Sequence, residues 1–268
     1  MEANLTLVHG IAGTRQEELN SLGIKDMHAL ANADAAELHL AWQQLTRYAP
    51  GLDEIRKMQI HARSWQQRRP IYFGGSSIPV RNKVVVLDLE YDNFACIWLV
   101  GLLAPNIEAT KCYQFFADER VDEKDILVKF IELVENYPTY QILTWDGLRA
   151  DIPQLEAAWN RHKLPKQKLQ SFRRRHLDLY NFFLHNWRFP LLSFGLKEIG
   201  RYLGFKRKYE DMDGLEAQML YHQYLNMPEN NKRQRSNIKQ KLLEYNKEDL
   251  EATLYVLNQL QSLANDTQ

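Results

Sequence analysis

The chain has 268 residues, enough for one or two domains that each bury a hydrophobic core. Its 34 Lys and Arg residues balance its 34 Asp and Glu residues, which excludes a strong overall field attracting nucleic acid, so any such contact must come from local patches. Two cysteines exclude a disulfide framework, and the first residues, MEANLTLVHG, lack the features of a signal peptide. No apolar run approaches the roughly 18 residues of a membrane span. We therefore expect a cytoplasmic protein without membrane contacts.

Residues 1–70 show the pattern of short helices only. Thr14 is a plausible N-cap for the segment TRQEELNSLGI, and Asp26 is one for DMHALANA. Two further segments carry apolar residues at steps of three and four, and Pro50 separates them. These signals predict a small all-α module over 1–70, followed by a Gly-, Ser- and Pro-containing connection and a second domain over 71–268.

The second part alternates strand and helix patterns. Three apolar runs with short connections predict an antiparallel meander, at 84–90, 94–103 and 111–117. An amphipathic helix over 122–136 then leads to a strand at 140–145, which should lie parallel to its neighbour because a helical crossover connects them. A short strand at 176–180 and a long final helix over 238–263 complete an α/β order. This order matches a ribonuclease-H-like mixed sheet flanked by helices.

Asp88 and Glu90 end the first strand of this domain, in VVVLDLEYDN. Side chains two positions apart on a strand share a face, so two carboxylates lie side by side where they repel each other. The nearest basic residues, Arg81 and Lys83, are at the other end of the strand. A bound divalent cation would turn this repulsion into an attraction, which makes the pair a candidate metal site.

Further acidic residues occur at the ends of elements that such a sheet brings together. Asp151 follows the fourth strand in TWDGLRADIPQL, and Asp249 lies on the final helix in EYNKEDLEATL. Tyr245 precedes Asp249 by one helical turn and shares its face. The alternative to a metal site is a set of unrelated acidic residues on the surface. Asp178, in HLDLY, is interpreted as a solvated strand end, and the alternative is a residue that supports the site.

The segments VLDLE, WDGLRAD and YNKED resemble the three exonuclease motifs of the DEDD superfamily of 3′–5′ exonucleases, in its tyrosine-type branch. The similarity covers roughly residues 80–262. It implies two divalent cations, Mg²⁺ or Mn²⁺, with Asp88 shared between them. Glu90 and Asp249 would complete the site that holds the attacking water, Asp151 would hold the second cation, and Tyr245 would orient or deprotonate the water.

The segment LVHGIAGTRQEEL resembles a helix-hairpin-helix module. The resemblance implies that backbone amides near Gly10 and Gly13 hold a nucleic-acid phosphate; the alternative is a helical cap that packs or binds a protein. A module of this kind before an exonuclease domain also resembles a group of predicted bacterial nucleases.

Runs of basic residues supply further candidates for contact with a phosphate backbone. They lie in FRRRH and KRKY, and the candidates are Arg173, Arg174, Lys206 and Lys208. Each run taken singly could equally be a solvated face.

Together these observations predict a metal-dependent nuclease, a 3′–5′ exonuclease acting on single-stranded DNA or RNA or on a 3′ end. The resemblance to a helix-hairpin-helix module favours DNA. The alternatives are a structure-specific endonuclease on the same fold and a nucleic-acid-binding module without turnover. No feature indicates a protein partner or an oligomeric state.

Overall fold

The computed structural model describes residues 4–74, 80, 83–105, 110–228 and 230–265. The chain forms two compact units, one containing the residues up to 74 together with 183–199, the other containing most of the remaining chain. Among the described residues, no helix combines the length and the apolar character that crossing a membrane requires.

The first unit is built from helices α1 (Gly13–Ser21), α2 (Met27–Asn32), α3 (Ala35–Leu45) and α4 (Leu52–Gln67), after a short 3-10 turn, Leu5–Leu7. Leu5, Leu19, Trp42 and Ile55 are fully buried in its core. The Asp26 carboxylate caps α2 by accepting a hydrogen bond from the Ala29 backbone N–H, as predicted. The prediction for Thr14 was wrong, because α1 begins at Gly13 after Ala12, without a side-chain cap.

A segment from much later in the chain completes this unit. Strand β7 (Trp187–Arg188) pairs antiparallel with β1 (Ile71–Tyr72), and the Ser64 hydroxyl on α4 donates to the Arg188 carbonyl at 3.2 Å. The rings of Trp187 and Phe189 are buried beside this pair. The helical segment before residue 70 therefore packs with residues 183–199, while the division into domains 1–70 and 71–268 stays a prediction.

The second unit is organised by a mixed five-stranded sheet. Its strands are β2 (Val84–Tyr91), β3 (Ile97–Pro105), β4 (Thr110–Phe116), β5 (Gln141–Thr144) and β6 (His176–Asp178). They lie in the order β4-β3-β2-β5-β6, with β2, β3 and β4 antiparallel and β5 and β6 parallel to β2. This confirms the predicted meander, the parallel crossover and the ribonuclease-H-like fold.

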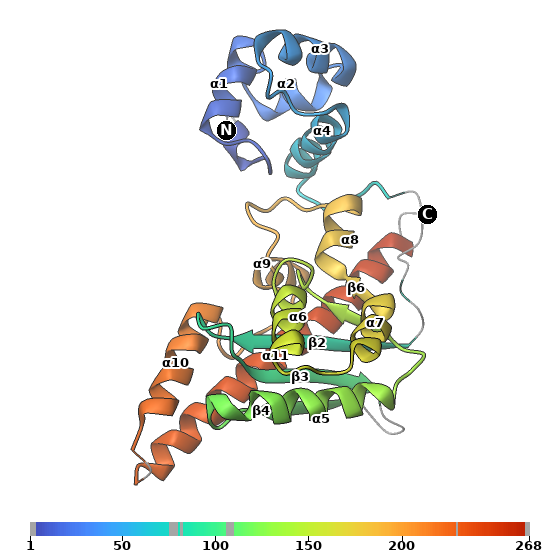
Figure 1. Ribbon diagram of the computed structural model, residues 1–268. Helices are drawn as coiled ribbons and strands as arrows, with labels where there is room; N and C mark the ends of the chain where they lie inside the picture. The colour runs from blue at the N-terminus through green and yellow to red at the C-terminus, as the bar shows by residue number, and fades with distance from the viewer. Residues whose placement is uncertain (1–3, 75–79, 81–82, 106–109, 229, 266–268) are drawn as a thin grey trace. The chain divides into compact units, whose positions relative to one another are not determined.

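Helices cover both faces of the sheet (Figure 1). On one face lie α5 (Glu123–Glu135), α6 (Asp151–Arg161) and α7 (Lys166–Arg175), against the odd-numbered residues of β2, such as Val85 and Leu87. On the other face lie α11 (Lys232–Asn265) and α10 (Gly214–Asn226). Because side chains alternate along a strand, Asp88 and Glu90 face α11.

Three helices were not predicted: α7, α8 (Leu179–Asn186) and α10. Helix α7 buries only Phe172 fully and is otherwise polar and basic, so it lacks the apolar period that identifies a helix. Asp213 caps α10 by accepting a hydrogen bond from the Glu216 backbone N–H. Helix α9 (Leu196–Leu203) ends before Gly204, whose φ of +97° explains the glycine.

Candidate metal centre

Strand β2 carries two of the acids past the point where its parallel neighbour ends. On one side, β2 pairs with β3 from Val86 to Tyr91, with Asp88 opposite Gly101. On the other side, β5 pairs only with Val84–Val86. In the described part of the chain, no strand pairs with that edge of β2 beyond Val86. The strand end is therefore open on that side, and Asp151, the first residue of α6, lies nearby.

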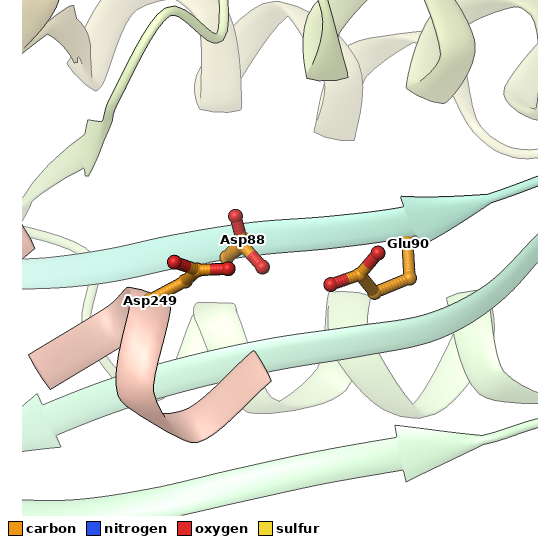
Figure 2. A group of neighbouring side chains, drawn as sticks. All are labelled: Asp88, Glu90 and Asp249. Atoms are coloured by element: carbon orange, nitrogen blue, oxygen red, sulfur yellow. The ribbon is translucent and has the colours of Figure 1, made fainter. Parts of the chain in front are cut away.

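The third acid comes from α11. One oxygen each of Asp88, Glu90 and Asp249 lies within 4.8 Å of the other two. Figure 2 shows the two carboxylates of β2 and the one of α11 turned toward a common region. Glu90 and Asp249 are each only 8% exposed, so burial adds to their mutual repulsion. The predicted convergence of these three residues is thus present in the fold.

Asp151 and Tyr245 line the same cavity as the three acids. The cavity has a volume of about 300 Å³, and Trp145 and Gln218 also contribute to its wall. Asp151 lies outside the three-acid group, although its charge raises the pKa of both Asp88 and Glu90. The cavity therefore contains four carboxylates and a phenol, with three of the carboxylates closely grouped.

Burial and mutual repulsion raise the pKa of every carboxyl group in β2 that faces the cavity. The pKa of Asp88 is raised by burial first and then by the charges of Asp249, Glu90 and Asp151. The pKa of Glu90 is raised in the same way, by burial and by Asp249. Burial and the charge of Asp178 raise the pKa of Asp151 to about 8, although a hydrogen bond from the Leu89 backbone opposes this. Ionising all four groups without a counter-ion is therefore unfavourable.

Two neighbouring polar residues that the sequence did not single out hold the acids. The Arg207 guanidinium donates to Asp249 Oδ1 at 2.5 Å, and the Asn246 amide donates to Asp88 Oδ2 at 2.7 Å. Arg207 lies within the basic run KRKY, where Lys206 and Lys208 were chosen instead. Asn246 lies inside YNKED, between the residues that carried the resemblance, so its position was a signal that could have been used.

Asp178 was interpreted wrongly as a solvated strand end. It is only 5% exposed, and its carboxylate accepts hydrogen bonds from the backbone N–H groups of Asp146, Leu148 and Asn181. These bonds hold the loop that leads from β5 to Asp151 at the start of α6. Asp178 therefore supports the site by fixing the backbone that positions Asp151.

The predicted phosphate-binding residues do not converge on the acids as a group. Arg173 and Arg174 lie in the last turn of α7, which ends where β6 begins, whereas Glu90 lies near the carboxyl end of β2. Arg173 forms an ion pair with Glu156, and Arg174 is exposed. These two arginines therefore lie at the amino end of the parallel strands, whereas the acids lie toward the carboxyl end.

Two other predicted basic residues flank Arg207. Lys206 is exposed, and Lys208 forms an ion pair with Glu244 at 2.5 Å. Gly10 and Gly13 belong to the first unit, where Gly10 has a φ of +88° and Gly13 begins α1. The Arg15 guanidinium donates to the Gly10 carbonyl at 2.7 Å, so the side chain of Arg15 holds the turn at Gly10.

The mixed sheet and its acidic cavity define an α/β domain of the ribonuclease-H-like class. A family model described as the RNase_H superfamily matches residues 85–261, and the chain belongs to this superfamily. Among solved structures, the chain is similar to the family B DNA polymerase from the hyperthermophilic archaeon Pyrobaculum calidifontis, with a TM-score of 0.50 and 16% identity. The match covers 69% of this chain and 25% of the polymerase, so it shows the fold only. Comparison with curated proteins finds no match.

Proposed function

We propose that the protein is a metal-dependent nuclease that removes nucleotides from the 3′ end of single-stranded nucleic acid. The observation that carries the proposal is the convergence of Asp88, Glu90 and Asp249 within 4.8 Å, in a cavity that Asp151 and Tyr245 also line. The resemblance of VLDLE, WDGLRAD and YNKED to exonuclease motifs supports cleavage from the 3′ end.

The donor set suits Mg²⁺ or Mn²⁺, because these hard cations prefer carboxylate oxygens. Burial raises the pKa of Asp88 and Glu90, so a cation would relieve a cost that the protein otherwise bears. Asp88, Glu90 and Asp249 would hold one cation, and Asp151 with Asp88 would hold a second. When bound, a pair of such cations activates a water molecule and stabilises the departing oxygen of a phosphodiester.

Tyr245 would orient the attacking water by a hydrogen bond rather than take its proton. Its side chain lines the cavity, and the residue is only 6% exposed. Burial and the charges of Asp249 and Glu90 raise the pKa of its phenol above the usual range, so the group stays protonated at neutral pH. A protonated phenol donates a hydrogen bond but is a poor base.

The substrate is proposed to be DNA rather than RNA, on the resemblance of the first unit to a helix-hairpin-helix module. Backbone near Gly10 and Gly13 would contact phosphate there. Among the basic candidates, Arg174 and Lys206 are exposed, which suits a contact with the nucleic-acid backbone, whereas Arg173 and Lys208 are already engaged by carboxylates.

The test is the product pattern from end-labelled oligonucleotides. Single-stranded DNA and RNA are incubated with the full chain and Mg²⁺ or Mn²⁺, with Asp88→Asn as the matched control. A ladder that shortens from the 3′ end and is absent in the control supports the proposal. Internal fragments at early times would instead show an endonuclease. Binding without metal-dependent cleavage of either strand would overturn the enzyme and leave a binding module.

A further inference from the structure

Asp88, Gly101 and Gln114 lie in one row across three neighbouring strands. The register pairs Asp88 of β2 with Gly101 of β3, and Gly101 with Gln114 of β4. The Asn246 side chain of α11 lies over the middle of this row, because a Cβ added to Gly101 would be 2.1 Å from Asn246 Oδ1. Only glycine at this position leaves room for the Asn246 amide between Asp88 and Gln114.

Hydrogen bonds determine which end of the Asn246 amide faces Asp88. The Leu243 backbone carbonyl can only accept, so the group of Gln114 that faces it is the NH₂, at 2.7 Å. The same Nε2 donates to Asn246 Oδ1 at 2.9 Å. The Asn246 NH₂ is then left to face Asp88, and Nδ2 donates to Oδ2 at 2.7 Å. A backbone carbonyl therefore sets the direction of the whole relay, and Asn246 within it is fully buried.

We propose that Asn246 is a positioning residue for Asp88, and that Gln114 determines that the NH₂ end of the Asn246 amide, not its oxygen, faces Asp88. The inference rests on the proposed function, because it assumes that Asp88 is a metal ligand. The bond from Nδ2 fixes the rotation of the Asp88 carboxylate, with Oδ2 engaged by the amide and Oδ1 left for a cation. Reversing the amide would bring a carbonyl oxygen against the carboxylate and spoil this orientation. Partners of this kind are worth about 10- to 100-fold in metal affinity.

The polarity can be reversed with little change of shape. Gln114→Glu is nearly isosteric. Because residue 114 is only half-buried, the variant can carry an ionised carboxylate, and this group cannot donate to Asn246 Oδ1. The Asn246 amide should then turn its NH₂ toward residue 114 and its oxygen toward Asp88. We expect Mn²⁺ affinity, measured by titration calorimetry on the full chain, to fall about 10- to 100-fold. An added negative charge acting only through its field would strengthen cation binding instead, so the sign of the change separates the two explanations.

Gln114→Met is the matched control. It removes the donor without supplying a competing acceptor, so Asn246 can keep its NH₂ on Asp88. Mn²⁺ affinity should stay within about threefold of wild type, well below the loss of about 10- to 100-fold expected when a metal ligand loses its partner. Asn246→Ser is the second variant, because a short hydroxyl side chain cannot bridge the row. It should weaken Mn²⁺ binding as Gln114→Glu does, and saturating Mn²⁺ should restore most of the cleavage rate, since no group that contacts the substrate is lost.

The outcomes separate this inference from the proposed function. A wild-type chain that binds no Mn²⁺ would overturn the proposed function. If the wild type binds Mn²⁺, two results would overturn the relay alone. One is an equal or tighter Mn²⁺ affinity in Gln114→Glu, and the other is an unchanged affinity in Asn246→Ser. Circular dichroism of each metal-free variant checks that it is folded. Should Gln114→Glu fail to fold, Asn246→Ser decides the question.

Discussion

The guanidinium of Arg207 donates to the carboxylate of Asp249 at 2.5 Å, and both side chains are nearly buried, at 6% and 11% exposure. Arg207 thus supplies a positive charge beside the acidic cavity. The loop that carries it is held along α11, because Lys208 pairs with Glu244 and the Lys208 backbone N–H donates to Glu248. Arg207 is therefore a built-in counter-ion for one of the three grouped acids.

Removing this counter-ion should destabilise the metal-free protein. Arg207→Met leaves the Asp249 carboxylate buried without its ion pair, which costs about 3–5 kcal/mol. The Mn²⁺-induced rise in Tm should at the same time become larger than in wild type, because a cation then replaces the missing charge. Thermal melts followed by circular dichroism, with and without Mn²⁺, measure both effects. Arg201→Met is the control, since that side chain is 61% exposed and its pair with Glu210 is long, at 4.0 Å. Equal melting behaviour of the two variants would contradict the prediction.

Asp88→Asn should abolish the response to metal. The Asp88 carboxyl is grouped with those of Glu90 and Asp249, and their charges raise its pKa. Removing its charge therefore lowers the repulsion and should raise the metal-free Tm slightly. The Mn²⁺-induced rise in Tm should largely disappear, together with cleavage. Asp125→Asn, at an exposed position in the first turn of α5, is the matched control and should retain both. A full Mn²⁺ shift in Asp88→Asn would place the metal elsewhere.

Tyr245→Phe tests the phenol alone. Tyr245 lines the cavity, and the change keeps its buried ring and removes only the phenol oxygen. Turnover should fall about 10- to 1,000-fold, the range that positioned polar groups supply. The Mn²⁺-induced shift in Tm should match wild type, because no carboxylate is lost. A variant that cleaves at the full rate would assign Tyr245 to packing.

The metal-free protein should lose stability as the pH rises. The pKa of Asp151 is raised to about 8, from an ordinary value of about 4 in an unfolded chain. Between these values the folded protein retains a proton at Asp151 that the unfolded chain has released, so the contribution of Asp151 to the free energy of unfolding falls with pH and levels off above about pH 8. Mn²⁺ competes with such protons, and its stabilising effect should therefore be larger at about pH 8.5 than at about pH 6. Melts at the two pH values measure this. Asp151→Asn should reduce the difference, and equal shifts in wild type at both pH values would count against the prediction.

Gly13→Ala tests phosphate contact by the first unit without disturbing its fold. A Cβ at Gly13 would meet nothing within 4 Å, and the residue lies in the first turn of α1, where alanine is favoured. The Tm should stay equal or rise, while affinity for single-stranded DNA should fall if the backbone there approaches a phosphate closely. Gly51→Ala, also with nothing within 4 Å, is the control in the same unit. DNA affinity that is unchanged in Gly13→Ala would assign this turn to packing or to a protein contact.

Point variants are preferable to deleting residues 1–70. Trp187, Phe189 and Phe194 are almost fully buried and belong to the unit that this deletion would remove. Deletion would expose their rings to water, so a loss of DNA binding could reflect aggregation rather than a lost contact.

The sequence by itself predicted the strands of the second unit and their relative directions, and its resemblance to exonuclease motifs pointed to the three grouped acids Asp88, Glu90 and Asp249. The strands and their directions follow from local features: apolar runs define strands, alternation places Asp88 and Glu90 on one face, and a crossover helix sets the direction of β5. Tyr245 and Asp249 were predicted because YNKED resembles an exonuclease motif, and their spacing of one helical turn places them on one face.

Only the tertiary structure decided which polar residues support that centre. Asn246 meets Asp88 across 158 positions of sequence, and Arg207 meets Asp249 across 42. Nothing in an isolated amide or guanidinium shows which distant carboxylate it will reach, because that depends on how α11 crosses the sheet. The same holds for residues 183–199, which join the first unit through the pairing of β7 with β1. Local patterns predicted where the charges would gather, and the packing of distant segments decided how those charges are held.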